Sequence, residues 1–304
     1  MHVARIQSTT SSNEIEGITA PPARIKALVE DRTTPKNRSE EEIAGYRSAL
    51  DLIHANHEHM PLSDSVTLQM HKTLLEFTGD DTRGKFKSVD NAIKEVHGDG
   101  TRVIRFHPTS ALQTPTAVRE LHERTTRALE QRELHPALVV GAFVLDFTCI
   151  HPFLDGNGRL SRLLTLLGLY KSGYSVGRYV SIERVIADSR DSYYEALQSA
   201  NEGWSSGTHD PTRWLGYFVG VLLAAYSRFE ENIDVIASYR GSKADAITNF
   251  VRARAIPVFT VSDVREAVSI ASDQHIRRVL HRLRDAGEIE STGTGRAAAW
   301  RRLN

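Results

Sequence analysis

The chain has 304 residues, its 38 Lys+Arg are balanced by 38 Asp+Glu, and 40% of its residues are hydrophobic. This length predicts two domains that can each bury a core, and the zero net charge argues against a wholly basic nucleic-acid-binding protein. The single cysteine excludes an internal disulfide framework and a thiolate zinc cluster.

Neither a membrane helix nor an export signal is expected from the sequence. The longest uncharged apolar stretch, Trp214 to Tyr226, is shorter than the roughly 20 residues that a membrane helix needs. The opening MHVARIQSTTSS lacks the long apolar segment of a secretory signal. We therefore expect a soluble, cytoplasmic protein in a reducing compartment.

Helical periodicity runs through most of the chain. Apolar residues recur at helical spacing from Ser39 to Met60, and Pro61 interrupts the pattern. The same pattern predicts helices over residues 63–77, 117–130, 136–150 and 161–170, and Pro211 opens another that runs towards residue 239. The expected fold class is mainly α.

Residues 83–109 break this helical pattern. Gly84, Gly98 and Gly100 punctuate two segments with strand character, 86–96 and 102–106, which an HGDGT turn separates. Together they predict a β-hairpin. The pattern alone does not tell a hairpin that binds a partner from one that only packs on the helices.

After Gly241 the composition changes, which predicts a separate small domain. A strand-like FTVSDV is followed by a helix, a second helix over 273–286, and two short strands around a Gly-rich turn. This order is typical of a winged helix-turn-helix. With a linker near Arg240 to Lys243, we expect an N-terminal segment over 1–38, a helical domain over 39–240 and a winged helix domain over 241–304.

The expected C-terminal domain carries a local positive charge. Residues 242–304 contain eleven Lys and Arg and seven Asp and Glu, a net charge of 11 − 7 = +4. The second helix of this domain, expected over 273–286, could enter a DNA major groove, with Arg296 on the wing reaching a phosphate. A domain that docks a protein or dimerises fits the same pattern. The polar and basic residues that crowd the second helix are Gln274, His275, Arg277, Arg278, His281, Arg282 and Arg284.

The residues with the clearest chemistry form the run HPFLDGNGRLSR, from His151 to Arg162, between two apolar helices. A Gly-Asn-Gly turn at a helix start points backbone N–H groups outward, where the helix dipole adds positive potential. Arg159 and Arg162 are spaced to place two guanidinium groups over one helix face, where they can meet phosphate oxygens. Asp155 offers Mg²⁺ a hard oxygen ligand, and His151 can accept a hydroxyl proton near neutral pH.

This run resembles the Fic family motif, His-Pro-Phe-x-[Asp/Glu]-Gly-Asn-Gly-Arg-x-x-Arg, at every specified position, and the resemblance covers residues 40–200. Fic proteins mostly transfer AMP from ATP to a protein hydroxyl. The resemblance implies that His151 deprotonates a target Ser, Thr or Tyr, and that Asp155 holds Mg²⁺ on the α and β phosphates. It assigns the following residues to phosphate binding: Gly156, Asn157, Gly158, Arg159 and Arg162.

The resemblance also covers two segments outside the motif. The expected hairpin is similar to the family's flap, which pairs with an extended target segment by strand addition. Phe106-His107-Pro108 departs from the double proline that often ends this flap. Relatives line the adenine with residues of a helix after the motif, although aromatic residues at this spacing are also common in a core. The corresponding candidates here are Tyr193, Tyr194 and Asn201.

Near the N-terminus, Ser12 to Gly17 carries the pattern Ser-x-x-x-Glu-Gly. It resembles the family's inhibitory motif, [Ser/Thr]-x-x-x-Glu-[Gly/Asn], in the class whose inhibitory helix precedes the catalytic core. By this resemblance Glu16 pairs with Arg162 and occupies the guanidinium that the γ phosphate of ATP needs. A Ser followed by acidic residues is also an ordinary helix start.

The leading hypothesis is an autoinhibited, Mg²⁺-dependent protein adenylyltransferase that uses ATP. It would modify a target protein, with the chain itself as a further candidate target, and we expect a homodimer, as for many relatives. A second hypothesis keeps the fold but removes AMP or transfers another phosphate-containing group. A third is a DNA-binding regulator that uses the nucleotide pocket as a sensor.

Overall fold

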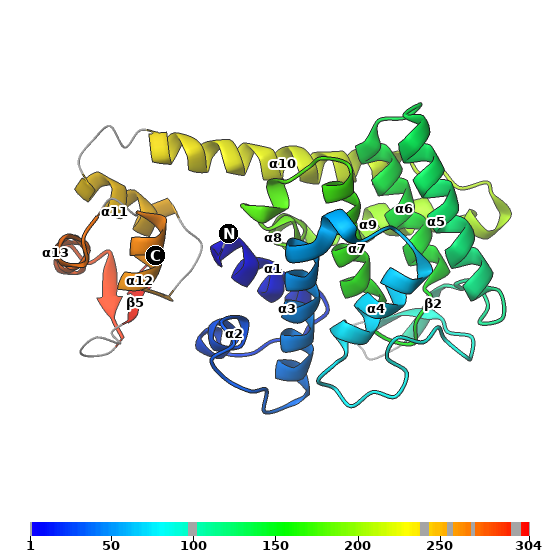
Figure 1. Ribbon diagram of the computed structural model, residues 1–304, viewed down its shortest axis with the longest axis horizontal. Helices are drawn as coiled ribbons and strands as arrows, with labels where there is room; N and C mark the ends of the chain where they lie inside the picture. The colour runs from blue at the N-terminus through cyan, green and yellow to red at the C-terminus, as the bar shows by residue number, and fades with distance from the viewer. Residues whose placement is uncertain are drawn as a thin grey trace. The chain divides into compact units, whose positions relative to one another are not determined.

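The computed structural model describes residues 2–96, 102–237, 243–253, 258–268, 271–292 and 299–303. Its contacts divide the chain into two compact units, Met1–Tyr226 and Ser227–Asn304 (Figure 1). The first unit is mainly helical, which confirms the expected fold class. Within the described residues, no helix combines the length and the apolar character that crossing a bilayer requires.

The helices of the first unit follow one another along the chain, with two strands between α4 and α5. They are α1 (His2–Ile15), α2 (Pro22–Val29), α3 (Arg38–Asn56), α4 (Asp64–Leu74), α5 (Thr114–Gln131), α6 (Pro136–Ile150), α7 (Asn157–Lys171), α8 (Ile182–Asp188) and α9 (Arg190–Asn201). Short 3₁₀ helices lie in the connections: η1 (His57–His59), η2 (Val176–Arg178) and η3 (Trp204–Ser206). The helix α10 (Thr212–Ala237) begins in this unit and continues past its boundary.

The apolar helix α6 forms the centre of the first unit. Its residues from Ala137 to Ile150 are mostly buried, because a helix that is apolar all round has to be enclosed by others. It packs against α5, α7 and α9, and these helices lie together in Figure 1. Gly168 lets α7 approach closely, since a Cβ there would lie 3.2 Å from the Val140 side chain. The connection from α6 to α7 therefore starts and ends on rigid helices.

The observed helix bounds differ from the expected ones at α3, α4 and α7. The structure ends α3 at Asn56, and α4 ends at Leu74, where turns replace the expected last residues to Phe77. It begins α7 at Asn157, whereas the sequence predicted a start at Ser161. The reason is Gly156, whose left-handed backbone (φ 78°) turns the chain directly into the helix. The Gly-Asn-Gly sequence therefore includes the first turn of α7.

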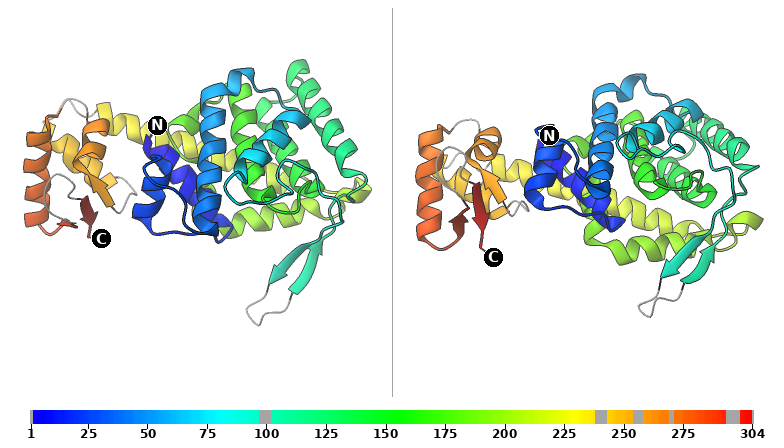
Figure 2. Two further views of the ribbon diagram at one scale, coloured as in Figure 1. Left: turned by 60° about the horizontal axis from the view of Figure 1, so that its bottom comes forward. Right: turned by 90° about the horizontal axis from the view of Figure 1, so that it is seen from below.

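Strands β1 (Ile93–Val96) and β2 (Arg102–Phe106) pair antiparallel, with Val96 opposite Arg102. The pair extends away from the helices of its unit (Figure 2). The expected strand over 86–96 is shortened because Lys87 and Asn91 bond to the connection between α6 and α7 instead. The predicted HGDGT turn, with Gly98 and Gly100, lies outside the described residues.

The second unit contains three further helices and a small sheet. Its elements are α11 (Lys243–Ala253), β3 (Val258–Thr260), α12 (Val261–Ala267), α13 (Asp273–Asp285), β4 (Ile289–Ser291) and β5 (Ala299–Arg302). The strands pair antiparallel in the order β3-β5-β4. Its core includes Phe250, Ile276 and Trp300. Arg296, the expected wing residue, and residues 240–242 of the expected linker lie outside the described residues.

The segment FTVSDV was expected to be strand-like throughout, and this was wrong for its second half. The strand β3 ends at Thr260, where α12 begins. The Thr260 side chain accepts a hydrogen bond from the Asp263 backbone N–H, and the Asp263 carboxylate accepts one from the Thr260 N–H at 2.6 Å. This reciprocal capping favours a helix over a continued strand.

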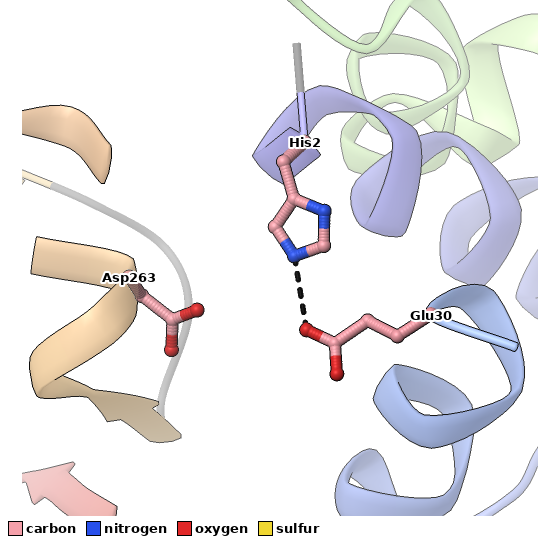
Figure 3. Close-up of side chains that lie close together, drawn as sticks. All are labelled: His2, Glu30 and Asp263. Carbon is pink, nitrogen blue, oxygen red and sulfur yellow. Dashed lines mark hydrogen bonds and ion pairs between the residues drawn. The ribbon is translucent and has the colours of Figure 1, made fainter. Parts of the chain in front are cut away.

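The N-terminal helices α1 and α2 are fastened to each other and to α3 by polar pairs and a small apolar cluster. His2 Nε2 lies 3.1 Å from Glu30 Oε1, just after α2 (Figure 3). Arg24 donates to Glu40 of α3 from Nε at 2.9 Å. The apolar cluster beneath these pairs comprises Ile25, Leu28, Val29, Ile43 and Ala44. These contacts hold α1 beside α3.

His122 of α5 is buried and lies with its Nε2 3.0 Å from Thr67 Oγ1 of α4. Burial lowers the pKa of His122 from 6.5 to about 4, so the folded protein holds it neutral at pH 7. The unfolded chain binds this proton more readily. The stability that the neutral ring contributes is therefore complete above pH 6.5 and is lost as the pH falls from 6.5 towards 4.

We predict that His122→Gln makes the free energy of unfolding less dependent on pH in this window. Glutamine does not titrate and can still bond Thr67, so the variant should lack up to roughly 3 kcal/mol of the wild-type loss between pH 6.5 and 4. Urea unfolding at several pH values measures both proteins. Identical pH dependence would show that His122 contributes nothing to it.

Candidate active site

The chain turns sharply at both ends of the connection from α6 to α7. His151 ends α6 with a left-handed backbone (φ 50°), and its N–H donates to Phe147 O at 3.0 Å. A non-glycine residue in this conformation is strained and persists only where its surroundings hold it. At the other end, a Cβ on Gly156 would lie 3.2 Å from the Leu74 side chain. The peptide N–H groups of the first turn of α7 have no partner within the helix and can bind an anion.

Phe153 and Asn157 close this connection from inside. Phe153 is fully buried and stacks on His71, with 3.7 Å between the ring centroids. The Asn157 side chain accepts from the Phe153 N–H at 2.9 Å and donates to the Phe153 carbonyl at 2.8 Å. Its amide is thus committed to the protein, so only the backbone of Asn157 can take part in the predicted anion site.

Lys87 and Asn91 hold the outer side of the connection, and the sequence reasoning missed both. Lys87 Nζ donates to the Ile150 carbonyl at 3.1 Å and to Asn91 Oδ1 at 2.8 Å. Asn91 Nδ2 donates to the Phe153 carbonyl at 3.0 Å. Burial lowers the pKa of Lys87 to about 8, and Asp90 opposes the shift. The sequence offered no signal to tell buried Lys87 from exposed Lys85.

His71 of α4 is a further residue that the sequence reasoning missed. The Gly84 N–H donates to its Nδ1 at 2.9 Å, so the proton must sit on Nε2, which donates to the Asp155 carbonyl at 3.1 Å. Burial lowers the pKa of His71 to about 4, which keeps the ring neutral. His71 therefore fixes the backbone of the residue predicted to bind a metal.

The His151 imidazole has one free nitrogen lone pair. Its Nδ1 lies 3.3 Å from the Thr148 carbonyl, which can only accept, so Nδ1 carries the proton and Nε2 is left as the basic atom. Burial lowers the pKa of His151 to about 4, although the Thr148 bond opposes this. The residue is therefore neutral at pH 7 and able to accept a proton.

Arg159 is buried and paired with an acid of α3. Its Nη1 lies 2.8 Å from Glu42 Oε2, and its Nη2 lies 3.6 Å from Asp155 Oδ2. Arg38 pairs with the same Glu42 and also comes within 3.6 Å of Asp155. Glu42 and Arg38 were absent from the predicted site, because nothing in their local sequence marks them. Arg159 thus already has an anionic partner.

Arg162 is 4% exposed and is held by α1. Its Nε donates to Ser12 Oγ at 2.9 Å, and its Nη2 donates to the Ser12 carbonyl at 2.8 Å and to Glu16 Oε1 at 2.7 Å. Burial disfavours the charged guanidinium, yet Glu16 together with Tyr193 and Tyr46 raises the pKa of Arg162. Among the described residues, its Nη1 has no hydrogen-bond partner.

The Glu16 carboxylate also lies against Gly158, in the first turn of α7. A Cβ at position 158 would come within 2.3 Å of Glu16 Oε1. Glu16 directly follows the C-terminal end of α1, where the helix dipole disfavours a negative charge. Arg162 and the N-terminal end of α7 compensate this charge. The structure therefore brings together Ser12, Glu16, Gly158 and Arg162.

Part of the chain is similar to one protein family. Residues 61–169 match the Fic/DOC family. This Fic/DOC region contains α4, both β1 and β2, α5, α6 and most of α7, and therefore the whole connection from His151 to Gly156. The residues that contact it from α1 and α3 lie before the matched region.

Curated relatives of the Fic/DOC region carry the name protein adenylyltransferase Fic. The protein from Drosophila ananassae is 28% identical over 193 residues, which is 62% of this chain and 35% of that protein. The one from Drosophila melanogaster is 28% identical over 204 residues, 66% of this chain and 38% of that protein. The chain thus spans little more than a third of the length of these relatives.

Solved structures share the fold. A Fic family protein from Desulfovibrio desulfuricans aligns with a TM-score of 0.60 at 20% identity, over 99% of this chain and 86% of that one. A Fic domain containing signaling protein from Bacteroides thetaiotaomicron aligns with a TM-score of 0.61 at 21% identity, over 74% of this chain and 85% of the other. At these identities the likeness concerns the fold alone.

The three adenine-pocket candidates beyond the Fic/DOC region are not equivalent. Tyr193 is buried, with its ring 5.9 Å from Trp214 and 6.0 Å from Tyr217, as in a core. Tyr194 is 42% exposed, and its hydroxyl donates to the Ile15 carbonyl at 3.4 Å. Asn201, half-buried, ends α9 two turns later. Of the three, Tyr194 is the exposed residue, and the Arg190 guanidinium lies over its ring, 5.7 Å from the centroid.

We predict that Gly158→Ala changes the sign of its effect on stability when Glu16 is removed. In the wild type the added methyl group displaces the Glu16 carboxylate from Arg162, and overpacking of this kind costs about 1–3 kcal/mol. In a Glu16→Gly background the clash is gone, and alanine in a helix ranges from neutral to about 1 kcal/mol stabilising. Urea unfolding of the four proteins in this cycle measures the difference. An equal effect in both backgrounds would contradict the contact.

We predict that His71→Phe lowers the free energy of unfolding by about 1–3 kcal/mol, because the ring can still stack on Phe153 but the Gly84 N–H and the Asp155 carbonyl lose their partner. Lys72→Gln, at the exposed neighbouring position, is the matched control and should be nearly neutral. Denaturant unfolding measures both. Equal stability of His71→Phe and wild type would show that these two bonds do not fix the connection.

Proposed function

We propose that this protein transfers AMP from ATP to a hydroxyl group of a target protein. The observation that carries the proposal is the neutral His151, whose free Nε2 lies in the connection that opens the N-terminal end of α7. The Fic/DOC region and its relatives named protein adenylyltransferase Fic support the same activity. Because the relatives are matched over only part of their length, the activity of this chain is a proposal.

In the proposed reaction, Nε2 of His151 takes the proton from a Ser, Thr or Tyr hydroxyl of the target. The hydroxyl oxygen forms a bond to the α phosphorus of ATP while the bond from that phosphorus to pyrophosphate breaks, so AMP is transferred and pyrophosphate leaves. Negative charge grows on the phosphate oxygens. Backbone N–H groups at the start of α7, from Asn157 and Gly158, would stabilise that charge.

Asp155 fits the role of a Mg²⁺ ligand. Its side chain is 52% exposed, and its Oδ2 approaches the guanidinium groups of Arg38 and Arg159 only at 3.6 Å. Its Oδ1 accepts from the Gly156 N–H at 2.6 Å, which orients the carboxylate. One carboxylate together with substrate phosphates is a usual setting for Mg²⁺. A bound ion would neutralise part of the phosphate charge.

We further propose that α1 inhibits this activity. Ser12 and Glu16 occupy the Arg162 guanidinium, which is the group that would otherwise meet the distal phosphates of ATP. Release of this pairing leaves the buried Arg162 cation without an anionic partner. A phosphate oxygen could then take that place. Inhibition and nucleotide binding would thus compete for one side chain.

The way in which α1 is docked makes its release feasible. Its buried residues are largely polar, among them Ser8, Thr9, Ser11 and Asn13. Ser8 donates to the buried Glu183 of α8 at 2.7 Å. Among the described residues, however, Thr9 Oγ1, Ser11 Oγ and Asn13 Oδ1 are buried without a hydrogen-bond partner. Unsatisfied buried polar atoms reduce the stability of a docked helix.

The strands β1 and β2 are proposed to bind the target. Val103 and Ile104 of β2 are about half exposed, and within the described residues no third strand pairs with β1 or β2, which leaves each strand an outer edge. An extended peptide could add to such an edge through main-chain hydrogen bonds. Because Lys87 and Asn91 tie the segment before β1 to the site, a bound hydroxyl would be held near His151.

We predict that Glu16→Gly raises AMP transfer at least about tenfold, because removing the pairing with Arg162 needs to lower the barrier by only about 1.4 kcal/mol for that gain. Adding His151→Ala should abolish transfer. Incubation with labelled ATP and Mg²⁺, followed by mass spectrometry, measures the modified protein and would also detect modification of the chain itself.

The matched control is Glu14→Gly, which removes a neighbouring exposed carboxylate of α1 without touching Arg162. It should leave transfer at the wild-type level. Equal transfer by all three proteins that retain His151 would remove the inhibitory role of Glu16. Label on the variant that lacks His151 would remove the proposed base. If Glu16→Gly transfers nothing but the wild type releases AMP from a modified protein, the chain removes AMP instead.

A further inference from the structure

The second unit has the element order and sheet topology of a winged helix-turn-helix. The helix α11 precedes β3, α12 and α13 follow, and β4 and β5 complete a sheet in the order β3-β5-β4. The helices α12 and α13 pack on each other, and α13 also packs on α11 and β4. In this arrangement the second helix of the helix-turn-helix lies on the surface and is the element that enters a DNA groove.

The outer face of α13 is polar and basic. Its inner face is buried through Ile276, Val279, Leu280 and Leu283. On the opposite face Gln274, Arg278, His281 and Arg282 are exposed, and their spacing of four, seven and eight residues places them in one stripe along the helix. This stripe, Gln274-Arg278-His281-Arg282, is called the α13 stripe below.

Two acidic residues of α13 form ion pairs with arginines outside the α13 stripe. Asp273 lies 3.4 Å from Arg265, and Asp285 lies 2.7 Å from Arg284. In the part of the unit that the structure describes, no ion pair involves Arg278 or Arg282. Arg282 donates to the Thr248 hydroxyl at 3.5 Å, and the neighbouring Glu288 forms its ion pair with Arg252 while also interacting with the charge of Arg282. The two arginines of the α13 stripe are therefore available to an external anion.

The side chains of the stripe suit DNA better than a protein surface. Protein interfaces depend on exposed aromatic and aliphatic anchors, whereas the large hydrophobic residue exposed in the described part of this unit is Leu303, outside α13. Arginine can bond guanine edges in the major groove or phosphates, and glutamine can bond adenine. The deep, narrow major groove of double-stranded RNA does not admit a helix.

We propose that the second unit binds duplex DNA by placing the α13 stripe in the major groove. Arg278 and Arg282 supply the contacts to phosphate or guanine, and Gln274 faces a base edge. This activity is separate from the proposed transfer of AMP and does not depend on it.

The test measures binding of the full chain to a fluorescent mixed-sequence DNA duplex by anisotropy, over a range of salt concentrations. Arg278→Ala combined with Arg282→Ala should weaken binding at least about tenfold and make the slope of log K against log salt shallower by about one to two. The matched control combines Arg265→Ala with Arg284→Ala, which removes two exposed arginines that already have acidic partners. It should bind within about twofold of the wild type.

Several results would overturn the proposal. They are the lack of salt-dependent binding of the wild type to duplex DNA, an equal loss in both double variants, or stronger binding to double-stranded RNA of the same length. Concentration-dependent self-association that both double variants share, without DNA binding, would assign the unit to contact between protein copies. Urea unfolding of each variant, and AMP transfer in the Glu16→Gly background if that activity is found, show that the proteins are folded.

Discussion

The need to compensate a buried guanidinium at Arg162 governs the first unit. A charge that is 4% exposed has to meet anionic or polar groups, and here Ser12 of α1 and Glu16, directly after α1, accept three hydrogen bonds from it. The same requirement gives the site its proposed affinity for a phosphate, because a guanidinium that loses Glu16 needs another anion. One physical constraint thus links the docking of α1 to the proposed chemistry. It also explains why position 158 has no side chain, since the Glu16 carboxylate lies where a Cβ would be.

Around this centre the connection from α6 to α7 is held by a neutral imidazole, a buried lysine and an ion pair. His71 is neutral and donates a hydrogen bond to the Asp155 carbonyl, and the buried Lys87 donates one to the Ile150 carbonyl. Arg159 and Glu42 neutralise each other. These supports leave His151 Nε2, the Asp155 carboxylate and the start of α7 as the groups that can act on a ligand. A rigid connection of this kind keeps reacting groups in place at little further entropic cost.

The described arginines of the second unit lie at its surface, in contrast to the buried Arg162 of the first unit. Arg252, Arg265, Arg284 and Arg301 form ion pairs at the surface of the second unit, where ion pairs contribute little to stability. Arg278 and Arg282 of the α13 stripe form no ion pair in the described part of this surface, although Glu288, which pairs with Arg252, also interacts with the charge of Arg282. The fold of this unit comes from its apolar core, so the outer face of α13 is free to be used for recognition.

Local patterns determined much of what could be predicted. The helices followed from apolar spacing, the expectation of a separate small domain over 241–304 from a change in composition, and the candidate site from the contiguous residues His151 to Arg162, whose chemistry belongs together. The contacts instead divide the chain at Ser227. The resemblance of two segments, Ser12–Gly17 and His151–Arg162, to family motifs predicted the pairing of Glu16 with Arg162, 146 residues apart. Such features can be predicted because they depend on neighbours in the sequence or on a motif that is already known from a family.

Tertiary structure alone decided which of several similar residues became part of the site. Lys87 rather than Lys85 is buried, Tyr194 rather than Tyr193 is exposed, and Glu42 of α3 meets Arg159. It also decided that α7 begins at Asn157, because the left-handed backbone of Gly156 is held against Leu74 of α4. In each case the outcome depends on which distant helix packs against the residue. Helical spacing fixes only the direction in which a side chain leaves its own helix, and not what it meets there.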